Sequence, residues 1–186
     1  MPPRGRNGAR RPARRLTPQE LEEYALRALA RRAHSAAELR LKLRRRAQSG
    51  ADAEHVLAYL RERGWLDDRR FAHSFARSRA ARRYGRYRIT RELRQRGLTD
   101  ELIEEALAEV FPSEKEERAL VRTRLERRLR GKARPYSDKL LRSAYASLLR
   151  AGFASAIIRD ELFKRTRRAL EEDNPEASGP PEDEQA

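Results

Sequence analysis

Side chains that could do three kinds of chemistry gather in the stretch RERGWLDDRRF, residues 61–71. The indole of Trp65 could stack on a nucleobase, the carboxylates of Asp67 and Asp68 could bind a metal ion, and the arginines could bind phosphates. Adjacent helical residues point about 100° apart, so the two aspartates make a poor metal clamp without further ligands. The stretch could also be a joint between two helices, and the elements on either side decide between these interpretations.

No other pattern in the sequence is typical of a catalytic or metal site. The three histidines, His34, His55 and His73, fall in different segments and lack the spacing of a metal-binding helix. The glycine-rich loops that cradle phosphates and the G-x-S-x-G turn of serine hydrolases are missing. We therefore expect a protein that is not an enzyme, with no catalytic residue, no metal and no cofactor.

The composition indicates the environment in which the chain works. The 186 residues include no cysteine, so disulfides and thiolate metal sites are excluded and a reducing cytoplasm is expected. No apolar run approaches the ~18 residues that are needed to span a bilayer. The N-terminus also lacks the apolar core of a secretory signal. These features predict a cytoplasmic protein without membrane contact.

The formal net charge is +15, and it is unevenly placed. Residues 1–15 hold six arginines and no acid, and residues 171–186 hold seven acids and no base. Between them, residues 16–170 hold 38 bases and 22 acids. Because the middle of the chain is strongly basic by itself, its field favours a polyanion, either nucleic acid or an acidic protein surface.

The densest basic stretch runs from Arg69 to Arg96 and contains eleven arginines against one acid, Glu92. Basic side chains with interleaved tyrosines around a glycine turn suit a phosphate backbone, and a tyrosine there could stack on an exposed base. Arg79 could instead pair internally with an acid, and the two tyrosines could pack between helices. The candidate contacts are Arg77, Arg79, Arg82, Arg83, Tyr84, Arg86, Tyr87, Arg88 and Arg91.

A second basic cluster lies at residues 122–136, at the end of one predicted helix and in the loop after it. Part of this cluster has a structural explanation, because cations near a helix C-terminus interact favourably with the helix dipole. The same ambiguity holds for a third cluster at residues 41–48. From the second cluster, the candidate contacts are Arg124, Arg127, Arg128, Lys132 and Arg134.

The elements that position these residues are predicted to be helices, because strand signals are nearly absent and capping signals are dense. Thr17 with Glu20, Ser35 with Glu38, and Ser113 with Glu116 form capping boxes, and Ser137 suits a further N-cap. Apolar residues recur at spacings of three and four between these boundaries. The expected helices are 18–33, 35–46, 52–63, 67–83, 86–96, 99–110, 113–130, 137–150 and 155–169.

Self-comparison of the sequence indicates repeats. ELRQRGLTDELIEEAL at 92–107 aligns with LLRAGFASAIIRDEL at 148–162, so that equivalent residues are 55 positions apart. We therefore predict an all-α fold of three tandem three-helix, helix-turn-helix-like repeats in an elongated, curved body. The repeats are 16–66, 67–112 and 113–170, between a disordered basic tail at 1–15 and a disordered acidic tail at 171–186.

The stretch at 61–71 then reads as the joint between the first two repeats. Gly64 suits the left-handed residue that ends a helix, and Trp65 follows at the position that folds back on that helix. Asp67 suits the N-cap of the next helix, with Asp68 at the positive end of its dipole. Leu66 and Phe71 complete a hydrophobic staple. This pattern of helix-capping residues favours structural roles for the tryptophan and the aspartates over stacking or metal binding.

Residues 59–107, YLRERGWLDDRRFAHSFARSRAARRYGRYRITRELRQRGLTDELIEEAL, resemble the central signature of the RecX family. That signature has Y-L-x-E-x-G-[YW]-[IL]-D-D, then F-A, a basic helix, a glycine turn and R-I-x-x-E-L. ALRALARRAHSAAELRLKL at 25–43 fits the family as well, and the third repeat is a looser match. Many family members have Gly-Pro where this chain has Gly85-Arg86, which affects the expected conformation of the turn.

The resemblance implies a non-enzymatic modulator of the RecA recombinase that acts in homologous recombination, DNA repair and the SOS response. Family members are thought to lie in the groove of the RecA–DNA filament and to inhibit strand exchange, ATPase and coprotease functions. The implied partners are the RecA nucleoprotein filament and single- and double-stranded DNA, and we expect a monomer. The alternative is a DNA-binding protein, sequence-independent or of the helix-turn-helix kind, that acts without RecA.

Overall fold

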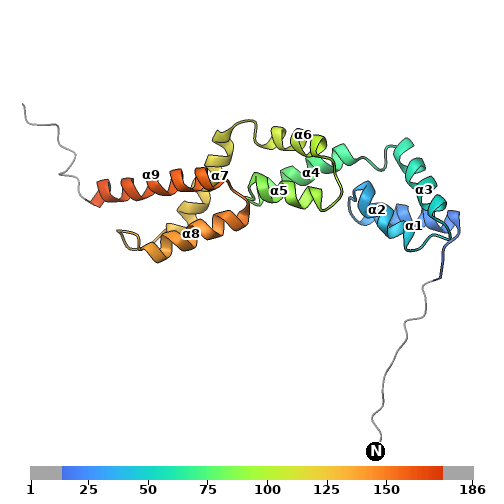
Figure 1. Ribbon diagram of the computed structural model, residues 1–186, viewed down its shortest axis with the longest axis horizontal. Coiled ribbons are helices and arrows are strands. Elements are labelled where there is room, and N and C mark those ends of the chain that lie inside the picture. Colours follow the sequence, from blue (N-terminus) through green and yellow to red (C-terminus); the bar gives the residue numbers. More distant parts are fainter. Residues whose placement is uncertain (1–13, 174–186) are drawn as a thin grey trace, which may run out of the picture. The chain divides into compact units, whose positions relative to one another are not determined.

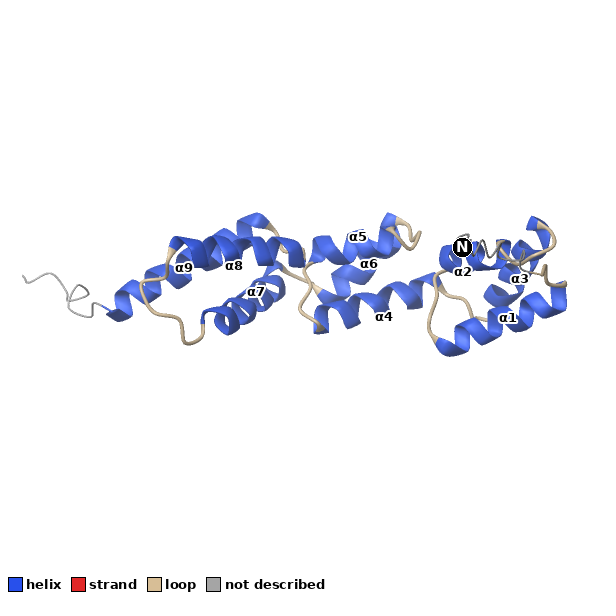
Figure 2. Cartoon of the chain, turned by 90° about the horizontal axis from the view of Figure 1, so that it is seen from below, coloured by secondary structure: helices blue, strands red, loops and turns tan. Residues whose placement is uncertain are grey.

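The computed structural model describes residues 14–173, and within this part the chain is all-α, with nine helices and no strand (Figures 1 and 2). The division between two compact units falls inside α4, between Phe71 and Ala72. The predicted division into three repeats stays a prediction. The helices are α1 (Pro18–Arg31), α2 (Ala36–Arg44), α3 (Gly50–Glu62), α4 (Asp68–Ala81), α5 (Arg86–Arg94), α6 (Asp100–Val110), α7 (Glu114–Leu129), α8 (Asp138–Ala151) and α9 (Ser155–Asp173).

The predicted N-caps are confirmed at α1, α2, α7 and α8, where a serine or threonine side chain accepts a backbone N–H of the first turn. The start of α3 was predicted two residues late. There Ser49 accepts from the Asp52 amide and the Asp52 carboxylate accepts from the Ser49 amide. This reciprocal box uses aspartate where the usual pattern has glutamate or glutamine, which is why the pattern did not reveal it.

The two predicted disordered tails include residues at their inner ends, 14–15 and 171–173, that belong to the folded part of the chain. Arg14 pairs with Glu20 at 2.6 Å, and Arg15 donates to the Ala47 carbonyl at 3.2 Å, so both residues belong to the first unit. At the other end, α9 continues to Asp173. The remaining residues of the tails, 1–13 and 174–186, lie outside the described residues.

The first unit packs α1 and α2 against α3 around leucines that are fully buried. Leu16 enters this core from the chain before α1, and its backbone N–H donates to the Arg46 carbonyl at 2.8 Å. This contact ties the entry to α1 onto the end of α2. The fully buried leucines are Leu21, Leu39, Leu43, Leu57 and Leu60.

The joint after α3 has the predicted backbone. Gly64 has a φ of +67°, the Gly64 amide donates to the Arg61 carbonyl at 2.9 Å, and the Trp65 amide donates to the Leu60 carbonyl at 3.0 Å. These two bonds form a Schellman motif. Leu66 is buried as expected, but the Trp65 side chain remains 45% exposed. The joint therefore uses the backbone of Trp65 and buries only part of its ring.

The two aspartates of the joint cap two different helices. The Arg70 amide donates to Asp67 Oδ1 at 2.9 Å, which confirms Asp67 as the cap of α4. Asp68 Oδ1 accepts the Ala36 amide at 2.8 Å. Ala36 is the first residue of α2, where a backbone N–H has no partner inside its own helix. Asp68 thereby fastens the start of α4 to the start of α2 within the first unit.

His34 is a buried base just before α2, and we expect its replacement to flatten the acid side of the stability curve. Burial lowers its pKa, and the nearby charges of Arg32 and Lys42 lower it further. The unfolded histidine takes up its proton near its ordinary pKa of about 6.5, whereas the folded one takes it up at lower pH. Stability from neutral His34 is therefore present above pH ~6.5 and is lost as pH falls through the folded pKa.

Urea unfolding at a series of pH values measures this effect. In His34→Gln the loss of unfolding free energy between about pH 7 and pH 5 should shrink, by at most about 1.4 kcal/mol per pH unit for one proton. His55→Gln, at an exposed position, is the matched control. An unchanged pH dependence in His34→Gln would show that this buried histidine does not govern acid stability.

The second unit contains the two aligned segments of the repeat, and their residues take equivalent positions. Gly97 and Gly152 both have left-handed backbones, with φ of +74° and +89°. The apolar residues that follow them, Leu98 and Phe153, are both buried. The α8–Gly152–α9 segment therefore repeats the local structure of α5–Gly97–α6, as the alignment predicted.

Close backbone contact joins α5 to the end of α8 inside the second unit. The Gly85 amide donates to the Ala151 carbonyl at 2.8 Å, and the Tyr87 amide donates to the Gly152 carbonyl at 3.0 Å. The first N–H groups of one helix thus satisfy the last carbonyls of another. A Cβ on Gly85 would lie 2.4 Å from the Gly152 carbonyl oxygen, so the contact needs glycine on the α5 side.

Candidate nucleic-acid interface

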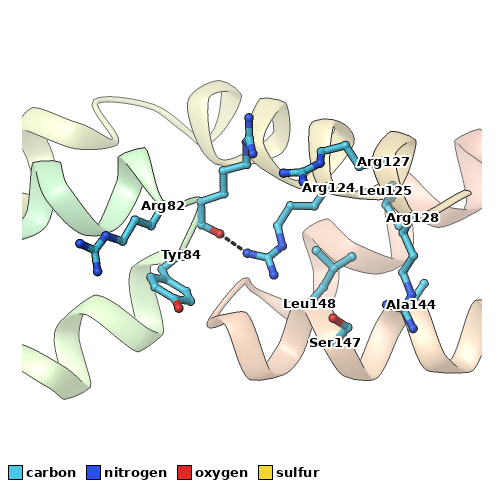
Figure 3. A pocket seen from close by; sticks show the side chains of 10 residues that line it. Arg82, Tyr84, Arg124, Leu125, Arg127, Arg128, Ala144, Ser147 and Leu148 are labelled. Carbon is cyan, nitrogen blue, oxygen red and sulfur yellow. Dashed lines mark hydrogen bonds between the residues drawn. The ribbon is translucent and has the colours of Figure 1, made fainter. Parts of the chain in front are cut away.

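A basic groove of about 440 Å³ lies between the end of α4, α7 and α8 in the second unit (Figure 3). Two of the predicted basic clusters meet here, although they are about forty residues apart in the sequence. Half of its ten lining residues are arginines and none is acidic. The groove is lined by Arg82, Arg83, Tyr84, Arg124, Leu125, Arg127, Arg128, Ala144, Ser147 and Leu148.

Arg124 holds the two walls of the groove together. Its Nη1 donates to the Arg83 carbonyl at 2.6 Å, the bond that is dashed in Figure 3. Arg83 has a φ of +58°, which is unusual for a residue with a side chain and turns the chain out of α4 toward Gly85. Burial lowers the pKa of the Arg124 guanidinium, and the neighbouring Arg127 and Arg83 also lower it. An arginine remains charged at neutral pH even so, and this one supports the wall of the groove.

The remaining groove arginines differ in their hydrogen bonds within the protein and in their exposure to solvent. Arg128 donates to the Ser143 hydroxyl at 2.6 Å and so leans along α8. Arg127 is exposed on α7, and Arg82 is exposed at the end of α4, where its side chain points away from Arg124 in Figure 3. Arg83, which is half-buried, and Arg127 line the groove itself.

Several predicted contact residues use their charge inside the second unit. Glu92 pairs with Arg79 at 2.7 Å and with Arg88 at 2.9 Å, so the internal alternative for Arg79 is the one that occurs. Arg77 pairs with Glu109 at 2.8 Å. Hydrogen bonds from His73 and then Arg77 lower the pKa of the Glu109 carboxyl, which keeps this pair ionised.

Arg86 joins α5 to the end of α6. Its Nη2 donates to the Phe111 carbonyl at 3.1 Å, and its guanidinium lies 5.7 Å from the centre of the Phe111 ring. A weaker ion pair with Glu104 at 3.6 Å adds to this contact. An arginine used in this way mainly stabilises the fold, so its substitution would disturb the second unit as well as any ligand contact.

The two predicted tyrosines have different surroundings. Tyr84 is half-buried, and the Arg88 guanidinium lies 4.0 Å from the centre of its ring, so it packs between helices as the structural alternative proposed. Tyr87 is 64% exposed on α5. Arg91 is exposed one helical turn further along the same face. Tyr87 and Arg91 therefore stay available to a ligand.

Lys132 and Arg134 lie in the loop between α7 and α8, and both are exposed. They follow directly after the α7 arginines of the groove. Their position extends the basic surface beyond the groove along the loop, as the grouping of residues 122–136 in the sequence suggested.

A second basic groove, of about 330 Å³, lies on the first unit. The sequence did not single it out, because arginines spaced along α1 look like an ordinary solvated helix face. The spacing of four between Arg27 and Arg31 was the available signal, since it puts both on one face. The groove is lined by Tyr24, Arg27, Ala28, Arg31, Arg32, His34 and Lys42.

The arrangement of the groove suits the binding of phosphate groups. Guanidinium groups in an open groove with an apolar floor can hold phosphate oxygens through charge-assisted hydrogen bonds. In the described residues, no group of three or more His, Asp or Glu side chains is placed to hold a metal ion. Within the same residues, no helix is long and apolar enough to cross a membrane.

Two family models match the chain. The model described as the first three-helix domain of RecX matches residues 23–60, and the model of the second three-helix domain matches residues 67–107. A protein from Thermus thermophilus, named regulatory protein RecX, is 43% identical over 60% of this chain and 74% of its own length. The Deinococcus radiodurans protein of the same name is 37% identical over 80% of this chain and 71% of its own length.

Other relatives are matched over less of their length. The proteins named regulatory protein RecX from Halorhodospira halophila and Mannheimia succiniciproducens are 47% and 42% identical, and the chain spans only 55% and 57% of their lengths. Among solved structures, RecX from Lactobacillus salivarius superimposes with a TM-score of 0.69 over 81% of this chain and 97% of that one. At 20% sequence identity, that likeness shows the fold.

Proposed function

We propose that this chain, which belongs to the RecX family, regulates the RecA recombinase by binding the RecA–DNA filament and lowering its ATPase, strand-exchange and coprotease activities. A regulatory role follows from the family, whose members carry the name regulatory protein RecX. The proposal adds RecA and DNA as the partners, in recombination and repair, and a non-enzymatic mode of action.

The observation that carries the proposal is the groove in the second unit, which gathers five arginines without an acid. Such a groove suits a polyanion. A RecA–DNA filament would offer two, the phosphate backbone of the DNA and an acidic protein surface. The contact residues proposed for it are Arg83 and Arg127 in the groove, Arg82 and Arg128 at its edges, and Tyr87, Arg91, Lys132 and Arg134 on the surface beside it.

The runner-up is a helix-turn-helix protein that reads DNA sequence without RecA, with α5 as its recognition helix. In such proteins the N-terminal residues of the recognition helix contact base edges in the major groove. Here the N-terminus of α5 is occupied, since Gly85 and Tyr87 donate to carbonyls at the end of α8. Arg86 and Arg88 are also engaged within the protein. This geometry favours phosphate contact over base reading.

The proposal is tested by titrating the full chain into RecA that hydrolyses ATP on single-stranded DNA. We expect hydrolysis to fall at less than one chain per RecA subunit, because a ligand of a filament can affect many subunits at once. RecA activity that is unchanged at a saturating concentration of the chain would show the proposal to be wrong.

Excess single-stranded DNA distinguishes action on the RecA filament from action by occupying DNA alone. If the chain acts on the filament, excess single-stranded DNA added after inhibition should leave hydrolysis low until the chain dissociates. If the chain acts only by occupying DNA, the excess should restore hydrolysis at once. Immediate and complete recovery would therefore support the alternative of a DNA-binding protein that does not act on RecA.

A further inference from the structure

We propose that Trp65 forms a nucleobase-stacking site at the end of α3 in the first unit, and that its ligand is single-stranded nucleic acid. This inference rests on the proposed phosphate contact and does not depend on RecA. The helix-capping pattern at residues 61–71 favours a structural role for Trp65. The structure shows that the backbone and the ring contact with Tyr59 of α3 fulfil that role, while Trp65 remains 45% exposed.

The indole has an aromatic and cationic setting without being covered by it. The Tyr59 ring meets it at 82°, with ring centres 6.0 Å apart, which is an edge-on contact rather than a parallel stack. The Arg63 guanidinium lies 5.9 Å from the centre of the Trp65 ring and 5.1 Å from that of Tyr59. With 45% of Trp65 exposed, a flat ligand can reach the indole without displacing a buried side chain.

The backbone that carries the ring is held in place. The Trp65 amide is bonded to the Leu60 carbonyl, and the next residue, Leu66, is buried in the core of the first unit. Arg70 Nη2 donates to the Gly64 carbonyl at 3.1 Å, so an arginine is fixed directly beside the turn. A stacking residue on such a support loses little conformational entropy on binding, which favours affinity.

The charge around the ring suits a ligand with phosphates. Residues 61–70 hold four arginines and three acids. Two of the acids, Asp67 and Asp68, accept backbone N–H groups at the starts of α4 and α2, where helix dipoles offset their charge. An exposed aromatic ring among arginines is the combination by which proteins bind single strands, stacking on bases and contacting phosphates. In a duplex the faces of the bases are stacked on one another, so only a single strand offers them along its length.

The sole tryptophan of the chain makes the contact directly observable, because all indole fluorescence comes from Trp65. The full chain, without RecA, is titrated with an oligothymidylate and with an abasic oligodeoxyribose phosphate of equal length. Fluorescence anisotropy of the labelled oligomers measures binding, and the indole emission measures stacking. We expect both oligomers to bind, and only the oligothymidylate to quench Trp65.

The matched variants are Trp65→Leu, which keeps an apolar side chain, and Trp65→Phe, which keeps an aromatic face. Trp65→Leu should bind the oligothymidylate roughly 5- to 150-fold more weakly, from the usual range for loss of a stacked aromatic residue. Its affinity for the abasic oligomer and its helical circular dichroism should be unchanged. Trp65→Phe should recover part of the affinity.

Three results would overturn the inference. Binding of the oligothymidylate with no quenching and no loss in Trp65→Leu would remove the stacking site and leave the phosphate contact standing. Equal losses for both oligomers, together with reduced helicity, would make Trp65 a structural residue. No binding of either oligomer to the native chain would remove the proposed phosphate contact itself, and this inference with it.

Discussion

Gly152→Ala is expected to lower the unfolding free energy of the second unit by between about 2 and 5 kcal/mol. This loss combines the cost of overpacking, about 1–3 kcal/mol, with the cost of an alanine in a left-handed backbone conformation, about 1–2 kcal/mol. A Cβ at this position would lie 2.3 Å from the Arg88 amide nitrogen and 2.4 Å from Arg88 Cβ. These atoms belong to the first turn of α5 and cannot rotate aside, so the two backbones must separate. Urea unfolding followed by circular dichroism measures the loss.

Gly64→Ala is the matched control for Gly152→Ala. Gly64 has a φ of +67°, but a Cβ there would meet no atom within 4 Å. This variant should therefore show only the cost of the left-handed backbone, about 1–2 kcal/mol. Equal losses in the two variants would mean that the close approach of Gly152 to Arg88 contributes nothing to stability.

Gly85→Ala tests the same contact from the other side. Gly85 has a φ of −84°, so an alanine there carries no left-handed cost, yet its Cβ would lie 2.4 Å from the Gly152 carbonyl oxygen. The double variant, Gly85→Ala with Gly152→Ala, should lose less unfolding free energy than the two single variants lose together. The first alanine already separates the two helices, so the second has less contact to disrupt. Strict additivity would contradict the view that the two glycines serve one contact.

The helices and their joints could be predicted from the sequence because their signals are local. A cap such as Thr17 with Glu20 involves residues three positions apart, and the turn at Gly64 depends on one glycine and its neighbours. Local bonds of this kind form in the same way whatever the rest of the chain does. For the same reason the basic stretches could be identified as candidates for polyanion contact.

The groove could not be predicted, because it depends on contacts between distant segments. Arg124 on α7 donates to the carbonyl of Arg83, 41 residues earlier in the chain, and the close approach of Gly85 to Gly152 likewise joins distant segments. The ion pair of Arg88 with Glu92 has the local i,i+4 spacing, whereas the sequence leaves the pairing of Arg79 with an acid open and only the fold shows that the acid is the same Glu92. Charge counting overestimates the arginines available to a ligand wherever one acid is shared in this way.

Arg83→Glu with Arg127→Glu is expected to weaken single-stranded DNA binding by roughly tenfold to a hundredfold, if each lost charged contact costs about 1 kcal/mol or more. Both residues line the groove, and the bond from Arg124 to the Arg83 carbonyl uses backbone that the substitution keeps. The salt dependence is more specific than the affinity. The slope of log K against log salt should fall by about 0.7 for each phosphate contact that is lost on a single strand.

Lys139→Glu with Arg159→Glu changes the net charge equally at exposed positions outside the groove and is the matched control. It reduces the long-range field of the protein without removing a groove contact, so its binding should weaken less and its salt slope should stay the same. The groove variant should also lose inhibition of RecA-dependent ATP hydrolysis in proportion to its loss of binding. Equal effects of the two variants would mean that the charge of the whole chain, rather than the groove, attracts DNA. Lost binding with full inhibition would instead place the groove on the DNA side of the filament and require a separate surface for RecA.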